Sequence, residues 1–250
     1  MRLTVIVPMF NEAATIAPTL MALAEQSDAD FEVVFCDNSS TDGTATLVGR
    51  YAAERTLPWV VVHEPMKGTG AAADTAARAA IAAGATHLAR TDADCLPAGT
   101  WVATIKRVFD DSNDLLIAGI SYPRTDDQPI GGGRATLLRV VNEVAIFFGR
   151  VRPSNHGPQF RGPYMMVSGN NVAFTAELYQ TAGGFTRTAI EDVHEDRELI
   201  QTVRLFTDKY SFHRDIVVHA SARRIQAWGV ARSLLWYTGH HFRPEHVDIR

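Results

Sequence analysis

Two aspartates separated by one residue, Asp92 and Asp94, are the first candidates for chemistry in this chain. They follow a short apolar run that begins at His87, and Pro97 and Gly99 soon end any regular element. This pattern predicts a strand that places paired carboxylates at its C-terminal end. In an open α/β sheet, ligands collect at that end, and two carboxylates there suit a hard cation shared with a phosphate-bearing ligand. Asp-x-Asp also occurs in ordinary surface loops, so its meaning depends on the rest of the chain.

A second acidic cluster lies between residues 190 and 199. Acids in the first turn of a helix complement the helix dipole, so a charged helix start is the simplest interpretation. Here, however, the acids outnumber the single base Arg197 by more than helix capping requires. The acids are Glu191, Asp192, Glu195, Asp196 and Glu198.

The elements that position these side chains are predicted to alternate between strands and helices. Leu3 to Pro8 is an apolar run without alternation, which is typical of a strand covered on both faces, as in a parallel sheet. Further strands are expected at 31–35, 60–63, 87–91, 115–121 and 216–219, with two short ones around 168–171. Helices are expected from about Thr15, after Gly70 to about Ala83, at 99–109 and 134–149, and up to 183–185, with a loop at 126–133.

Two predicted βα loops carry further polar candidates. Asp37 ends the second strand, where it either belongs to a capped turn or accepts hydrogen bonds from a nucleotide ribose or base. Lys67 or Arg78 can face a diphosphate, although a solvated charge is the commoner role for such side chains. Gly68-x-Gly70 lacks a third glycine at the required spacing and does not follow the first strand, which excludes a dinucleotide-binding fingerprint.

Composition restricts the class of protein. The chain has 250 residues, 46% hydrophobic and 21% charged, with a formal net charge of -4, so we expect a globular protein without general affinity for nucleic acid. Strand-like residues follow Met1 so closely that no signal peptide is expected, and a cytoplasmic location is predicted. Cys36 and Cys95 are expected to be reduced and to serve packing.

Taken in order, these motifs resemble glycosyltransferase family 2, whose members have the nucleotide-diphosphosugar transferase (GT-A) fold. VIVPMFNE resembles the family's first strand and loop, CDNSSTDGT its second, KGTGAA its third and TDADC its DxD metal motif; SGNNVAF, AGGF and HEDREL resemble its acceptor-side half. The resemblance implies an α/β fold with a mixed central sheet flanked by helices. It also implies one GT-A domain at 1–220, with a nucleotide-sugar-binding half at 1–98 and an acceptor-binding half at 99–220, followed by a basic, aromatic tail at 221–250.

The resemblance also implies roles for individual residues. Asp94 would bind Mg²⁺ or Mn²⁺, with Asp92 on the metal or the ribose and His219 as a third metal ligand, or as a structural histidine. Asp196 would be the general base, although Glu191-Asp192 can be the family's acidic pair in place of Glu195-Asp196. The donor would be a UDP- or GDP-sugar. The nucleoside would be lined by Pro8, Phe10, Glu12 and Asp37.

The function implied is metal-dependent, inverting sugar transfer to an acceptor hydroxyl. A retaining transferase that makes a small glycoside and a catalytically inactive nucleotide-sugar-binding protein are the alternatives. A sugar nucleotidyltransferase is disfavoured because PMFNE is not the Gly-rich, basic loop that such enzymes carry after the first strand.

The C-terminal tail carries five arginines against Glu245 and Asp248, interleaved with aromatic residues. It can pack on the domain, contact a second subunit as a homodimer, or lie at the inner face of the membrane and present a lipid-linked acceptor. The Gln-x-x-Arg-Trp motif of processive family members is absent from the sequence, which favours transfer of single sugars.

Overall fold

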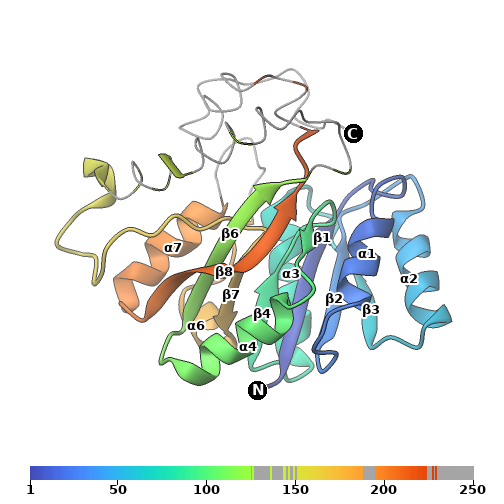
Figure 1. Cartoon of the computed structure of the whole chain (residues 1–250), viewed down its shortest axis with the longest axis horizontal. Helices are drawn as coiled ribbons and strands as arrows, with labels where there is room; N and C mark the ends of the chain where they lie inside the picture. Colours follow the sequence, from blue (N-terminus) through green and yellow to red (C-terminus); the bar gives the residue numbers. More distant parts are fainter. Residues whose placement is uncertain are drawn as a thin grey trace.

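One mixed sheet of eight strands forms the centre of the computed structural model (Figure 1), in the order β3-β2-β1-β4-β7-β6-β8-β5. The structure describes residues 1–124, 126, 136, 143, 144, 146, 149, 151–187, 195–223, 227 and 229. The strands are β1 (Leu3–Met9), β2 (Glu32–Asp37), β3 (Trp59–His63), β4 (His87–Arg90), β5 (Leu96–Pro97), β6 (Leu116–Pro123), β7 (Val172–Thr175) and β8 (Tyr210–Ala220).

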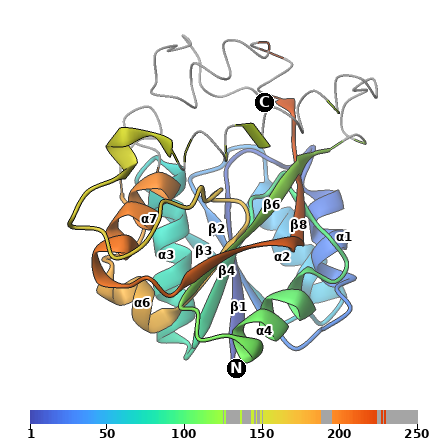
Figure 2. The ribbon, with the colours of Figure 1, turned by 60° about the vertical axis from the view of Figure 1, so that its left-hand side comes forward.

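Helices cover both faces of this sheet (Figure 2). One face carries α1 (Ala17–Ala24), α2 (Thr44–Glu54) and α4 (Trp101–Asp111), and the other carries α3 (Thr69–Ala82), α6 (Ala176–Thr181) and α7 (Glu195–Phe206). A short 3-10 helix spans Pro153–Asn155. In the part of the chain that the structure describes, no helix is long and apolar enough to cross a membrane.

The parallel half of the sheet brings the predicted βα loops to one edge. β1 pairs in parallel with β2 and with β4, and β2 pairs in parallel with β3. All seven residues of β1 are buried, as its apolar run predicted, because helices pack on both of its faces. The loops after β1, β2, β3 and β4 therefore lie together at the carboxyl ends of the strands, where the polar candidates were expected.

The other half of the sheet differs from the prediction in three places. The expected strand before Ser168 is wrong: β7 is flanked by β4 and β6, so the preceding residues have no free strand edge beside them and instead bury Tyr164 and Met165 in the core. β8 is longer than predicted and continues past the exposed Arg214 and Asp215, which broke the apolar pattern. The two-residue β5 was not predicted.

A bulge lets β8 follow β6. The parallel register between the two strands shifts between Gly119 and Ile120. A Cβ atom at Gly119 would collide with the carbonyl oxygen of Ile216, so this close approach requires glycine. The register that follows places His219 opposite Tyr122, at the same edge of the sheet as the βα loops.

Both cysteines are free and buried, as expected for a packing role. Burial, together with the nearby carboxylates of Glu64 and Asp37, raises the pKa of Cys36 to about 12. Burial also raises the pKa of Cys95 well above the usual thiol value. Neither thiol is therefore suited to act as a nucleophile at neutral pH.

Candidate active site

The loops after β1 and β2 are joined by hydrogen bonds between them. The backbone N–H of Asn11 donates to Ser40 Oγ at 2.9 Å, and Asn11 Oδ1 accepts from the backbone N–H of Thr41 at 2.8 Å. The backbone N–H of Glu12 donates to Thr44 Oγ1 at 2.8 Å. The capping and turn residues of the second loop thus hold the first loop in place. The sequence of either loop alone does not predict these contacts.

Four residues predicted to line a nucleoside lie near the ends of β1 and β2 or in the loop after β1. Pro8 is buried in β1, Phe10 is half-buried just beyond the strand, and Glu12 is only 6% exposed. Asp37 ends β2; its carboxylate accepts a hydrogen bond from the backbone N–H of Ser40 at 3.2 Å, and its Oδ2 lies 3.5 Å from His63 Nδ1. The structure therefore brings all four to one edge of the sheet.

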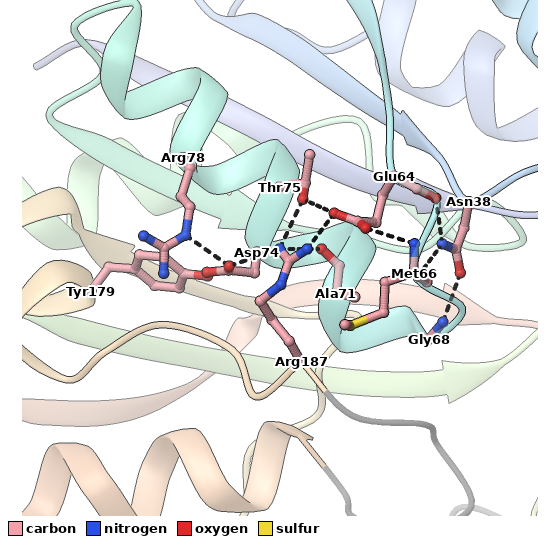
Figure 3. A network of polar contacts seen from close by, with 10 residues as sticks. All are labelled: Asn38, Glu64, Met66, Gly68, Ala71, Asp74, Thr75, Arg78, Tyr179 and Arg187. Carbon is pink, nitrogen blue, oxygen red and sulfur yellow. Dashed lines mark hydrogen bonds and ion pairs between the residues drawn. The ribbon is translucent and has the colours of Figure 1, made fainter.

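The loop that carries Lys67 is held by the amide of Asn38, the residue after Asp37 (Figure 3). Asn38 Nδ2 donates to the carbonyl oxygens of Glu64 and Met66 at 2.9 and 2.7 Å, and its Oδ1 accepts from the backbone N–H of Gly68 at 2.9 Å. Gly68 has φ 145°, which favours glycine. Lys67 itself is exposed, so its ammonium group is accessible beside the predicted donor site.

An ionic network around the buried carboxylates of Glu64 and Asp74 extends from this loop across α3 (Figure 3). Arg187 donates to Glu64 Oε2 at 2.6 Å and to Asp74 Oδ2 at 3.1 Å. Asp74 is 0% exposed and also accepts from Arg78 Nε at 2.8 Å and from the Tyr179 hydroxyl at 2.9 Å. Two carboxylates thus meet two guanidinium groups, and Arg187 links the chain after α6 to α3 and to the loop before it.

Replacing Asp74 with alanine is expected to lower the free energy of unfolding by about 3 kcal/mol, because the Tyr179 hydroxyl and two guanidinium groups lose a common acceptor inside the fold. The value is at the low end for a broken buried pair, since Arg78 and Arg187 are partly exposed and can be rehydrated. Urea denaturation measures it. As a control, Glu32→Ala breaks the exposed pair with Arg2 and should cost less than about 1 kcal/mol; equal losses would contradict a stabilising role for the network.

Asp92 and Asp94 lie in the turn directly after β4 and are 29% and 27% exposed. Arg90, which is 1% exposed, donates from Nε to Asp92 Oδ1 at 3.2 Å. Arg223 donates from Nη2 to Asp94 Oδ2 at 2.8 Å. The backbone carbonyl of Asp94 accepts from Arg124 Nη1 at 2.9 Å. Three arginines therefore surround the paired acids, and none of them was predicted to be part of the site.

Two of these arginines occupy positions in the sequence that could have indicated a role in the site. Arg90 is a charged residue at the end of an otherwise apolar strand, directly before the acids. Arg223 belongs to the basic stretch that follows the last predicted strand. The position of Arg223 in the sequence does not identify the acid that it contacts, because the place where β8 ends in the sheet decides that pairing.

Asp196 is the second residue of α7. Its Oδ2 accepts from the backbone N–H of Gly169 at 3.1 Å, and its Oδ1 accepts from the backbone N–H of Arg197 at 2.7 Å. A Cβ atom on Gly169 would lie 3.1 Å from the guanidinium carbon of Arg90, so the loop before β7 packs directly against the arginine that contacts Asp92. Asp196 and the paired acids are thus neighbours through Arg90, whereas Glu191 and Asp192 lie outside the described residues.

His219 lies in β8, opposite Leu96 of β5 and Tyr122 of β6. Among the residues described, no three or more His, Cys, Asp or Glu side chains form a group that could hold a metal ion. This does not conflict with a cation shared with a ligand, since Mg²⁺ is commonly held by one or two carboxylates together with phosphate oxygens. A positively charged side chain already lies beside Asp94, because the Arg223 guanidinium is placed between the carboxylates of Glu12 and Asp94.

The mixed sheet, its two helical layers and the acids at the carboxyl ends of its strands define a GT-A fold. The chain belongs to glycosyl transferase family 2: the model of that family, described as "Glycosyl transferase family 2", matches residues 4–169. Over 208 residues the chain is 30% identical to the glycosyltransferase AglE of Haloferax volcanii, covering 76% of this chain and 64% of AglE.

Solved structures give the same fold. The mannosyltransferase PcManGT of Pyrobaculum calidifontis, in complex with GDP-Man and Mn²⁺, is 27% identical with a TM-score of 0.66, covering 94% of this chain and 62% of PcManGT. S. aureus TarS 1-349 in complex with UDP-GlcNAc is 17% identical with a TM-score of 0.66, covering 89% of this chain and 59% of that one. The chain spans less than two thirds of the length of each of these relatives.

Proposed function

We propose that this chain is a metal-dependent, inverting glycosyltransferase that moves a sugar from a UDP- or GDP-sugar to an acceptor hydroxyl. One observation carries the proposal: the carboxylates of Glu12 and Asp94 converge on a single positive group at the carboxyl ends of β1 and β4. That edge is where an α/β sheet binds ligands, and the negative charge gathered there around Asp94 suits a cation that a diphosphate shares.

The donor nucleotide would lie over the loops after β1, β2 and β3. Pro8 and Phe10 offer apolar surface to the base, Asp37 offers a hydrogen-bond acceptor, and the exposed Lys67 can contact the diphosphate. The complexes of PcManGT with GDP-Man and Mn²⁺ and of TarS with UDP-GlcNAc support a nucleotide-sugar donor.

Mg²⁺ or Mn²⁺ would be held by Asp94, with Asp92 on the ion or on the ribose, and His219 as a further ligand. When bound, the ion neutralises negative charge that develops on the departing nucleoside diphosphate. Asp92 and Asp94 would fix the ion next to the diphosphate, while the buried Arg90 holds Asp92 in position.

Asp196 would act as the general base. The acceptor oxygen bonds to the anomeric carbon, its proton passes to the Asp196 carboxylate, and the bond from the anomeric carbon to the phosphate oxygen breaks on the opposite face. One such displacement inverts the configuration. The two backbone N–H groups that donate to Asp196, together with its place at the start of α7, stabilise the ionised form that a base requires.

Calorimetric titration with UDP and with GDP, each with and without Mn²⁺, tests the proposal. One diphosphate should bind, and Mn²⁺ should tighten its binding. Binding that ignores the metal, or no binding, would instead favour the catalytically inactive alternative. Anomeric analysis of the product by NMR separates inversion from retention. A lipid-linked acceptor stays a prediction, and so does a cytoplasmic location. Contact of the tail with the membrane or with a second subunit is also a prediction, because most of residues 221–250 lie outside the described residues.

A further inference from the structure

Arg223 links the C-terminal end of the sheet to both acids of the proposed donor site. Its Nη2 donates to Glu12 Oε1 at 2.7 Å and to Asp94 Oδ2 at 2.8 Å, and its Nη1 donates to Glu12 Oε2 at 3.2 Å. The side chain is 19% exposed and lies three residues beyond the end of β8. Three charge-assisted hydrogen bonds therefore tie this segment to the loop after β1 and to the turn after β4.

The carboxylate of Asp94 has both of its oxygens engaged. Oδ2 accepts from Arg223, and Oδ1 lies 3.5 Å from the Cys95 thiol. A cation that coordinates Asp94 through Oδ2 competes with the guanidinium for the lone pairs of that oxygen. One that uses Oδ1 must tolerate a positive charge bound to the same carboxylate, which repels a divalent ion.

Arg124, the other arginine that contacts Asp94, does not fill the same role. Arg124 donates to the backbone carbonyl of Asp94, and its charge is paired with Asp126, with Nη2 at 2.8 Å from Oδ2. Arg223, in contrast, contacts the two carboxylates themselves. The attraction of Glu12 and Asp94 raises the pKa of Arg223 although burial opposes it, so the group stays charged at any working pH.

We propose that Arg223 is an internal counter-ion that competes with a divalent cation for Asp94, so that cation binding detaches the segment after β8 from the donor loops. The inference rests on the proposed function in one respect, namely that Asp94 binds the cation. Ala220 stays in the sheet opposite Pro123 and accepts a hydrogen bond from the backbone N–H of Arg124 at 2.8 Å, so the exchange moves only the residues beyond it. Occupancy of the donor half is thereby signalled to the C-terminal end of the sheet.

Mn²⁺ binding without nucleotide, followed by electron paramagnetic resonance of the free ion, tests this competition. Arg223→Gln removes the competing charge and should tighten Mn²⁺ binding by roughly tenfold. Arg223→Lys keeps one charge but cannot bridge both carboxylates, so an intermediate affinity is expected. Arg107→Gln on α4 is the matched control, because it removes an equal charge from the exposed pair with Asp215 of β8 and should leave the affinity unchanged.

The outcomes separate this inference from the proposed function. If Asp94→Asn abolishes Mn²⁺ binding but Arg223→Gln binds as the parent does, or more weakly, the counter-ion role is wrong. If Asp94→Asn binds Mn²⁺ as tightly as the parent, the assignment of the metal to Asp94 fails instead.

A measurement on the unaltered protein guards against misfolded variants. Saturating Mn²⁺ should speed hydrogen exchange of the backbone amides from Ser221 to Arg223, and it should not do so in Asp94→Asn. Unchanged exchange in the parent protein at saturating Mn²⁺ would overturn the proposal.

Discussion

Replacing Asp94 with asparagine is expected to lower kcat/KM for the donor by at least about 100-fold, because the carboxylate that would hold the cation against the diphosphate loses its charge while the shape of the turn is kept. Turnover is measured as release of nucleoside diphosphate from the donor. Mn²⁺ should also stop strengthening the binding of UDP or GDP to this variant, and that result does not depend on an acceptor.

Asp110→Asn provides the matched control for Asp94→Asn. Asp110 is exposed on α4, away from the acids at the edge of the sheet, and its replacement removes the same negative charge as Asp94→Asn. Its donor turnover and metal dependence should equal those of the parent. A parent-like rate for Asp94→Asn would show that this acid is not the one the cation needs.

Replacing Asp196 with asparagine is expected to reduce kcat by about 10²- to 10⁴-fold, the usual contribution of a general base. Asparagine retains an oxygen that can accept the hydrogen bond from the backbone N–H of Gly169, so the loop beside Arg90 should keep its place. The dissociation constant of the donor should therefore change little, and the loss should fall on the chemical step, which single-turnover kinetics resolves.

The same helix offers a control for Asp196→Asn. Glu198 is exposed two residues further along α7 and accepts a hydrogen bond from the Thr186 hydroxyl. Glu198→Gln should keep the parent's kcat. If both variants turned over the donor at the parent's rate, the base would have to be another group, and Asp192, the alternative in the same acidic cluster, would be examined next.

The parallel half of the sheet, β1 to β4, was largely predictable from the sequence. Its strands are apolar runs that end in turn residues, and parallel pairing brings the loops after them to one edge without any knowledge of distant contacts. This is why Glu12, Asp37 and Asp94 were expected at the same edge, and why the mixed α/β sheet of the GT-A fold is confirmed. Their roles in binding and catalysis stay predictions.

What could not be predicted depends on pairings between distant segments. β5 has only two residues and exists because β8 lies beside it, with Leu96 opposite His219. The contact of Arg223 with Asp94 joins residues 129 positions apart and is decided by where β8 ends in the sheet. Local patterns of apolar and polar residues carry no information about such contacts.

The most direct test of the account is anomalous diffraction from a crystal soaked with Mn²⁺ and the nucleoside diphosphate that binds. We expect the manganese peak beside the Asp94 carboxylate, shared with the diphosphate oxygens, and the Arg223 guanidinium withdrawn from that carboxylate. A nucleotide bound over the loops after β1 and β2 with its manganese elsewhere would contradict the central claim.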